Sequence, residues 1–557
     1  MFTMDSLVFL AIAVAILFAA IQRGGDGART MSEKTHRAIC GAAIAAGVLV
    51  RLARLTSLPA GISAEEALVG VQAKALWQTG GFLFGQGLTT QLSQWAGETT
   101  GPLLAVLTAP FVGLFGMSKL TVRLPLALLS CAAMPAAYGL GEALSGKRAA
   151  RWMLTIAALC PIFVLEARMT CGSCAALYLL PIALCLIARG VTKPAALYPG
   201  MIVLALTAYA QDMYFFIAPA AILACAIIAL VFGRKKRHAV ISGTIGLLLC
   251  VPAMLTAFVN LTGAEGMMLL GLIRIPRLEG FEKTFMAENR SVGDKLWAVL
   301  IGGVFQVLRH ENIHQAMYTP DGMLALFMFS LPLMALGALA LFARWTDGRR
   351  AAREKAAARA MAAATGAVTL AALVMFGSVG TMNTSGTTGL FDHSALILFD
   401  AVLMTAGLCT IERKNLKCAA AMVALMAANF AWLAVQLFGG SYQANANVYF
   451  PGFEQMAARA AEIQAETGEK INVTGNVYPH IQPSDGAEMM FLYATDADMR
   501  TAEAERGTRY ETIYVSEDMQ PEADQIYLAR VNEISNWDLE GFDYEESEGY
   551  VLIYPAR

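Results

Sequence analysis

The stretch VRLARLTSLPAGISAEEALVGVQAKALWQTG, residues 50–80, decides how the chain is interpreted. Its first residues close an apolar run long enough to cross a membrane, and the rest predicts an amphipathic helix that opens with adjacent acids, Glu65 and Glu66. Carboxylates this close to a bilayer cost free energy unless water, a partner or a function holds them there. The stretch therefore predicts a polar site at the end of a membrane helix. Helix capping is the structural alternative, because a helix N-terminus favours negative charge.

The composition predicts a polytopic α-helical membrane protein. The chain has 557 residues, of which 57% are hydrophobic and only 15% are charged, and its mean hydropathy is +0.54. A soluble protein of this length carries far more charge, whereas apolar runs of about 20 residues match a hydrocarbon core about 30 Å thick. We expect about twelve spanning helices, near residues 4–22, 38–56, 122–143, 151–167, 173–189, 196–212, 214–233, 239–260, 322–343, 359–380, 392–411 and 417–438.

The basic links between these segments predict an orientation in the cell membrane. With this set of helices all six links fall on one side, which the positive-inside rule assigns to the cytoplasm. The tail from residue 440 then lies outside. The links are residues 23–37, 145–151, 188–193, 234–238, 344–355 and 412–417.

One apolar run would break this agreement. TGPLLAVLTAPFVGLFG, residues 100–116, looks long enough to cross, but a crossing here would move the later basic links to the other side. We therefore expect an interfacial or re-entrant helix within the first outer loop, with a true crossing as the alternative.

The charge distribution divides the chain into a membrane domain, 1–439, and a small outer domain, 440–557. The tail has 22 acids and 7 Lys/Arg, and the remainder has 34 Lys/Arg and 21 acids. The basic surplus suits cytoplasmic loops, so no nucleic-acid partner is expected. In the tail, residues 453–468 predict a helix, and INVTG, TIYVS and YVLIYP predict strands of an α/β domain.

The cysteines indicate packing rather than disulfides or metal binding. None of the ten lies in residues 440–557, so a disulfide framework in the tail is excluded. Cys171 and Cys174 form a single CxxC without a second pair or a nearby His, which is more typical of small packing residues than of a metal or redox site.

The predicted outer loops gather polar residues that suit an anionic lipid headgroup. Arginine chelates phosphate oxygens, and a carboxylate can deprotonate an incoming hydroxyl. Arg123 is also consistent with a helix-start anchor, and Glu166 with Arg168 is consistent with a structural ion pair. The acid pair stands out most clearly. The candidates are Glu65, Glu66, Lys74, Glu98 and Arg123 in the first loop, Glu166 and Arg168 in the second, and Arg309 and His310 in the long loop.

Three segments in order carry a family resemblance. They are residues 50–80, the run TTGPLLAVLTAPFVGLFGMSKLTVRLPLAL, and ALSGKRAARWMLTIAALCPIFVLEARMTCGS. This order resembles bacterial membrane glycosyltransferases of the GT-C superfamily, with glycosyltransferase family 39, the protein O-mannosyltransferase and aminoarabinose-transferase group, as the most similar. The resemblance is clearest over residues 45–190 and weaker at 318–341 and at the start of the tail.

The resemblance implies transfer of a sugar from a polyprenyl-phosphate carrier to a glycan, lipid or protein acceptor at the outer membrane face. Glu65 and Glu66 match the family's acid pair, so Glu65 is expected to be the base. The other expected binding residues are Lys74, Arg168, Arg309, His310 and Asn383, with the basic groups stabilising the leaving phosphate. Such a donor needs no nucleotide. No cofactor is implied, and we expect no metal.

Two departures from the family pattern keep a second reading open. No acid follows Arg168 in the next residues, and no arginine accompanies Asn383. A non-catalytic scaffold or lipid-glycan binding protein with the same fold is therefore the alternative. A transporter is less favoured, because the charges cluster at one face and the two halves show no repeat.

Overall fold

The computed structural model describes most of the chain. The described residues are 4–22, 31–83, 85–93, 99–171, 174–210, 213–278, 291, 293–294, 324–346, 353–376, 394–439, 450–474, 485–515 and 519–556. Four candidate site residues, Glu98, Arg309, His310 and Asn383, lie outside them.

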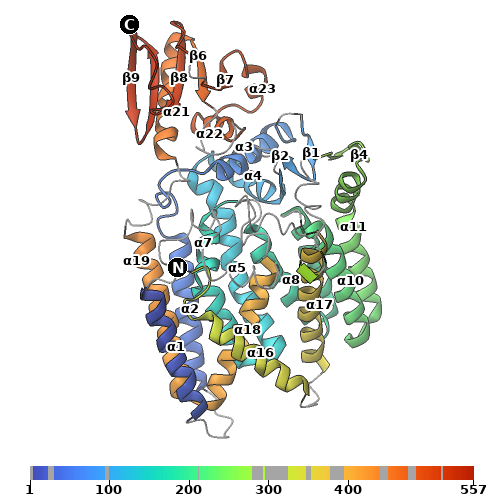
Figure 1. Cartoon of the computed structure of the whole chain (residues 1–557). Helices are drawn as coiled ribbons and strands as arrows, with labels where there is room; N and C mark the ends of the chain where they lie inside the picture. Colours follow the sequence, from blue (N-terminus) through green and yellow to red (C-terminus); the bar gives the residue numbers. More distant parts are fainter. Residues whose placement is uncertain are drawn as a thin grey trace.

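A bundle of helices makes up the larger part of the molecule (Figure 1). Every one of the twelve segments predicted to span contains a helix or a helix pair. The helices are α1 (Met4–Gln22), α2 (Glu33–Leu52), α5 (Lys119–Ser145), α6 (Lys147–Leu159), α7 (Pro161–Leu165), η2 (Glu166–Arg168), α8 (Cys174–Gly190), η3 (Pro194–Ala196), α9 (Leu197–Leu206), η4 (Thr207–Tyr209), α10 (Tyr214–Phe232), α11 (Lys236–Thr262), α16 (Ser330–Thr346), α17 (Arg353–Phe376), α18 (Ser394–Lys414) and α19 (Leu416–Phe438).

The structure does not confirm the predicted number of twelve membrane spans. Among the described residues, five helices are long and apolar enough to cross a membrane, namely α2, α5, α10, α11 and α19. The pair formed by α6 and Pro161–Arg168 passes the same test together but is bent by 60°. Several of the other predicted spans are shorter apolar helices.

The bend in the predicted 151–167 span has a local cause. Pro161 stands at the first position of α7, and Cys160 before it is extended, with φ −70° and ψ 133°. Proline removes a backbone donor and disfavours a helical residue before it, which leaves carbonyls at the end of α6 without helical partners. The buried Arg51 side chain supplies donors for these carbonyls, at 2.7 Å from the Ala157 oxygen and 2.9 Å from the Ala158 oxygen.

A buried ionic cluster joins three of the basic links at one end of α2. Glu412 is 1% exposed and accepts hydrogen bonds from Arg151 and from the Trp152 ring nitrogen, the latter at 2.8 Å. Arg148 lies 3.3 Å from the same carboxylate, and Lys147 lies 3.3 Å from Glu33. The links 23–37, 145–151 and 412–417 therefore meet at the Glu33 end of α2, away from its Leu52 end.

The described residues of 57–121, the predicted first outer loop, form a layer across the other end of the bundle. Helix α3 (Ala64–Thr79) packs against α4 (Leu103–Phe115), so closely that a Cβ on Gly113 would lie 2.1 Å from the Trp77 ring. The 13 residues of α4 span about 20 Å, less than a hydrocarbon core of about 30 Å. Short strands complete this layer: β1 (Leu88–Thr89), β2 (Leu92–Ser93), β3 (Thr99–Thr100), β4 (Met267–Leu269) and β5 (Ile273–Ile275).

These strands form two small sheets. In the order β1-β5-β4, β1 runs parallel to β5 with Leu88 opposite Ile273, and β4 is antiparallel to β5. Strands β2 and β3 pair antiparallel.

Residues 450–556 fold as an α/β unit on a five-stranded sheet. The strand order is β7-β6-β8-β10-β9, with β6 parallel to β7 and β8, and β10 antiparallel to β8 and β9. Strands β6 and β10 match the predicted strands INVTG and YVLIYP, whereas β7 overlaps the predicted strand TIYVS only at Thr512 and Ile513. The predicted helix is α21, which ends at Thr467 and is capped by Gly468 with φ +79°. The elements are α21 (Pro451–Thr467), β6 (Lys470–Thr474), α22 (Asp485–Ala494), α23 (Ala502–Glu505), β7 (Tyr510–Ile513), β8 (Gln525–Arg530), β9 (Phe542–Ser547) and β10 (Tyr550–Pro555).

This α/β unit rests on the first outer loop (Figure 1). Buried side chains of α3, such as Ala67 and Leu68, share one apolar cluster with Phe453 of α21 and Met490 of α22. The close approach requires glycine at Gly61, where a Cβ would lie 2.7 Å from the backbone nitrogen of Pro451.

Candidate functional site

The two adjacent acids have different surroundings. Glu66 is 1% exposed and completes a capping box at the start of α3. Its backbone nitrogen donates to Ser63 Oγ at 3.2 Å, and its carboxylate accepts from the Ser63 backbone nitrogen at 3.3 Å. This reciprocal pattern satisfies two backbone donors that the helix cannot pair itself. The capping alternative therefore describes Glu66.

Arg123 of α5 pairs with the same carboxylate. Its Nε and Nη2 donate to the two oxygens of Glu66, each at 2.8 Å, and both side chains are buried. Arg123 also donates to the carbonyl oxygens of Leu55, Pro59 and Gly61 at 2.7–3.0 Å. A bidentate pair of this kind fixes geometry as well as charge. It ties the loop between α2 and α3 to the start of α5.

Glu65 faces a different group. Its side chain is half-buried on the first turn of α3, and its carboxylate acts electrostatically on Glu166 of η2, which is 5% exposed. The fold thus brings a second carboxyl group, from the second outer segment, near the first acid of the pair. The negative charge of one carboxylate disfavours ionisation of the other.

Glu166 also contacts the CxxC motif. The Cys174 thiol lies 2.7 Å from a carboxylate oxygen of Glu166, and the two sulfur atoms of Cys171 and Cys174 are 2.8 Å apart. All three side chains are buried. The packing interpretation of these cysteines was therefore incomplete, because one thiol is a hydrogen-bond partner of a buried acid next to Glu65.

Arg168 donates its terminal nitrogens to backbone carbonyls, and its predicted role as a phosphate ligand stays a prediction. It is 1% exposed, and Nη1 donates to the carbonyl oxygens of Val50 and Ala53 at 2.6 and 2.9 Å. Nη2 donates to the Leu58 oxygen at 2.9 Å. These acceptors are the last carbonyls of α2 and the loop after it, which lack helical partners. In this geometry Arg168 holds the end of α2 in place.

Lys74, which is also predicted to bind the substrate, contacts the α/β unit. Its ammonium group donates to the side chain and the backbone oxygen of Asp496, at 2.7 and 2.8 Å. Asp496 follows α22, so this contact joins α3 to the α/β unit.

Sequence reasoning missed three contributors to the site. Thr170 donates its backbone nitrogen to Glu66 at 3.3 Å, Cys174 donates to Glu166, and Arg51 holds the broken helix before η2. The CxxC spacing was the only signal for any of them, since the other two contacts join residues 104 or more positions apart. Within the described part of the chain, no group of three His, Cys, Asp or Glu is arranged to hold a metal ion.

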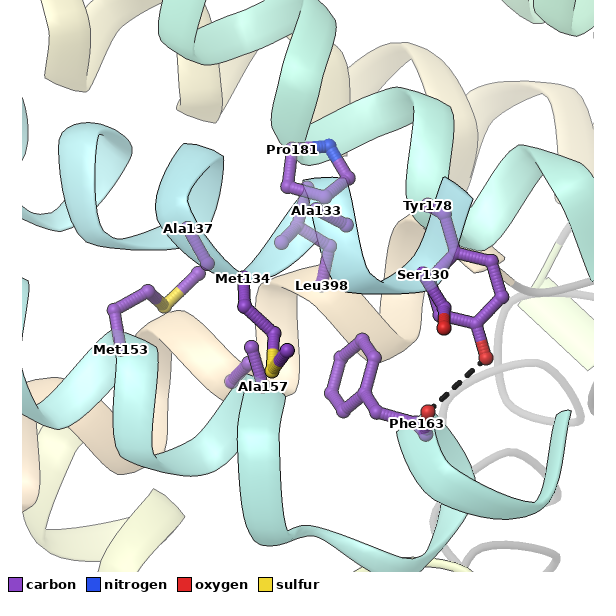
Figure 2. A pocket seen from close by; sticks show the side chains of 11 residues that line it. Ser130, Ala133, Met134, Ala137, Met153, Ala157, Phe163, Tyr178, Pro181 and Leu398 are labelled. Atoms are coloured by element: carbon purple, nitrogen blue, oxygen red, sulfur yellow. Dashed lines mark hydrogen bonds between the residues drawn. The ribbon is translucent and has the colours of Figure 1, made fainter. Parts of the chain in front are cut away.

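A small apolar pocket lies inside the bundle (Figure 2). Met134 of α5, Phe163 of α7 and Tyr178 of α8 contribute to its wall, and the Tyr178 hydroxyl donates to the Phe163 carbonyl at 3.1 Å. A lining this poor in polar groups suits no phosphate, so it is not the candidate site. Its lining residues are Ser130, Ala133, Met134, Ala137, Met153, Ala157, Phe163, Tyr178, Pro181, Leu398 and Ala401.

The fold of this chain is similar to folds of solved structures at low sequence identity, and five of its described helices are long and apolar enough to cross a membrane. A similar solved structure is ArnT from Cupriavidus metallidurans bound to undecaprenyl phosphate, at 9% sequence identity and a TM-score of 0.53. The match covers 93% of this chain and 98% of that one.

A weaker similarity is to the archaeal oligosaccharyltransferase AglB from Archaeoglobus fulgidus in complex with an inhibitory peptide and a dolichol-phosphate. The identity is 12% and the TM-score 0.44, over 83% of this chain and 63% of that one. No protein-family model matches the sequence, and no curated protein matches it.

Proposed function

We propose that the chain is a membrane glycosyltransferase that moves a sugar from a polyprenyl-phosphate donor to an acceptor at the outer membrane face. The observation that carries the proposal is the separation of the acid pair. Glu66 is committed to Arg123 and the helix cap, whereas Glu65 is half-buried beside Glu166 at the end of the bundle covered by the first outer loop. The shared fold with ArnT, whose structure holds undecaprenyl phosphate, supports the choice of donor.

In the proposed reaction Glu65 takes the proton of the acceptor hydroxyl. The acceptor oxygen forms a bond to the anomeric carbon of the sugar, and the bond from that carbon to the phosphate oxygen breaks. The polyprenyl phosphate then leaves with the bonding electrons, so negative charge grows on its oxygens. We propose Arg309, His310 and Asn383 as groups that meet this charge. Arg168 and Glu66 have positioning roles, because their contacts hold the loop that precedes Glu65.

The first experiment compares Glu65→Gln with Glu66→Gln. The assay supplies purified protein with a panel of sugar-loaded undecaprenyl phosphates, and measures released undecaprenyl phosphate. We expect Glu65→Gln to lose on the order of 100-fold or more in turnover, the range typical of a missing general base. Its thermal unfolding temperature should stay at the wild-type value. Glu65→Asp should restore part of the rate.

Glu66→Gln is the matched control. It removes one charge of a buried pair, so it should lower the unfolding temperature and affect turnover only through stability. Full turnover by Glu65→Gln would remove Glu65 from the mechanism.

Two contacts support a second candidate function, that of a non-catalytic protein that binds a lipid-linked glycan, because they pair polar groups with the protein itself. Arg168 donates to carbonyls of the α2–α3 connection, and the carboxylate of Glu166 accepts from Cys174. The same assay separates the two functions. A non-catalytic protein binds the loaded lipid and releases no undecaprenyl phosphate with any sugar of the panel.

A further inference from the structure

An apolar hairpin extends from the loop layer just after α11. Strands β4 and β5 pair antiparallel with Leu269 opposite Ile273, and Leu270 and Gly271 form the turn, with φ values of 53° and 68°. The Leu272 backbone nitrogen donates to the Leu269 oxygen at 3.1 Å and closes the turn. Positive φ at both central residues is the pattern of a type I′ turn, which matches the twist of paired strands.

The residue at the tip is unusual for this turn. The first central position normally holds Asn, Asp or Gly, because a left-handed conformation strains other side chains. Here it holds Leu270, and its side chain is 86% exposed. Packing against the rest of the described protein therefore does not offset the strain. Backbone strain that local contacts do not offset points to a function.

The neighbours of Leu270 extend the apolar surface. Leu272 is 66% exposed, Met268 56% and Met267 42%. Contiguous exposed apolar side chains of this kind mark a contact with a membrane or another molecule.

The hairpin follows an exposed apolar face at the end of α11. Met254, Phe258 and Leu261, on the last turns of this helix, are all large exposed apolar residues. The 27 residues of α11 span about 40 Å, which exceeds a hydrocarbon core of about 30 Å, so the helix end lies near the lipid headgroups. The hairpin begins at Met267, four residues after the Gly263 cap, and Figure 1 shows β4 at the rim of the molecule just beyond α11.

The charges of the hairpin also suit lipid. Arg274 on β5 is exposed, and Arg277 follows it closely. Basic side chains at a membrane border are attracted to anionic headgroups and place apolar neighbours at the acyl boundary.

We propose that the β4–β5 hairpin inserts its tip, Leu270 with Leu272 and Met268, into the lipid leaflet on the side of the α/β unit. The hairpin then anchors the first outer loop to the membrane surface. Arg274 makes this link, because its backbone oxygen accepts from Thr90 at 3.4 Å and its Nη1 donates to the Gly85 oxygen at 3.1 Å. The inference holds whether or not the chain is a transferase.

The test places a bimane fluorophore on Leu270→Cys in the full-length protein, reconstituted in vesicles of phosphatidylcholine and phosphatidylglycerol. Tyr544→Cys is the matched control, since Tyr544 is 57% exposed on β9 of the α/β unit. Wild-type protein treated in parallel gives the background from the native cysteines. We expect the probe at 270 to emit at shorter wavelength, to be quenched by nitroxide-labelled lipids, and to show a several-fold lower iodide quenching constant than the probe at 544.

Two outcomes would overturn the proposal. One is equal iodide quenching at both positions, which places the tip in water. The other is protection from iodide without quenching by nitroxide lipids, which assigns the tip to a protein contact, either with another chain or with residues 279–323. A second variant guards against misfolding of the first. Leu270→Asn suits the left-handed turn, so it should preserve the hairpin while a probe on Leu272→Cys loses part of its lipid quenching.

Discussion

At the scale of single residues, adjacent acids have separate roles because consecutive helical side chains point about 100° apart. Glu66 points toward Arg123 and the cap, and Glu65 lies near Glu166. The acid pair could be found from the sequence, because its charge beside an apolar run was anomalous. The different surroundings of Glu65 and Glu66 could not be predicted, because they depend on residues 57 and about 100 positions away in the chain.

The buried pair makes a direct prediction at this scale. Arg123→Met leaves the Glu66 carboxylate buried without its bidentate partner, and it removes the donors to Leu55, Pro59 and Gly61. Breaking one side of a buried ion pair typically costs roughly 3–5 kcal/mol. We expect a correspondingly lower unfolding temperature in detergent.

The control for this variant is Arg37→Gln. Arg37 forms an exposed pair with Glu33, with side chains 78% and 52% exposed, and water screens such pairs. Its unfolding temperature should match the wild type. Equal stability of Arg123→Met and Arg37→Gln would show that the buried pair does not hold the site together.

At the scale of elements, the positions of helices were predictable because apolar runs of that length have few alternatives. Apolar runs cannot show a helix break whose backbone carbonyls are paired by a side chain from another helix. The 151–167 segment looked like one span, yet it bends at Pro161, and Arg51 of another helix donates to the buried carbonyls that lack helical partners there. This bend places η2, and with it Glu166, under the first outer loop.

Helix packing gives a second prediction. A Cβ on Gly337 of α16 would lie 1.9 Å from the Leu403 carbonyl oxygen of α18, so Gly337→Ala must push these helices apart. Small residues permit such close approach in membrane bundles. We expect a loss of roughly 1–3 kcal/mol, as for other overpacked cores, measured as a lower unfolding temperature.

Gly366→Ala is the matched substitution on α17. Among the described residues, its Cβ would meet only Phe399, at an ordinary 3.6 Å. Alanine is the better helix former, so stability should be unchanged or rise by up to about 1 kcal/mol. If both alanine variants behave alike, the α16–α18 approach is looser than described.

At the scale of the whole molecule, the α/β unit and the first outer loop share one core. Charge asymmetry predicted a separate tail domain, and the sequence pattern predicted β6, β10 and only part of β7, because both are local properties of the chain. The docking of the α/β unit depends on residues far apart in the chain, so the contact of Lys74 could not be predicted from its neighbours in the sequence. Lys74 is a basic residue of the predicted first outer loop, so the sequence suggested a phosphate ligand. In the structure Lys74 contacts Asp496, which lies 422 positions away in the chain.

The last prediction separates these two roles of Lys74. If Lys74 joins α3 to the α/β unit, Lys74→Met and Asp496→Asn should each increase hydrogen exchange in α22. The double variant should be no worse than Lys74→Met, because both changes remove the same contact. Asparagine tolerates the left-handed backbone of Asp496, with φ 47°, so its effect reports the charge alone. Since Asp496 is largely exposed, the pair should contribute no more than about 1 kcal/mol. If Lys74 instead binds the lipid phosphate, Lys74→Met should abolish transfer while Asp496→Asn leaves the rate unchanged, and the contact between the units would then be incidental to the chemistry.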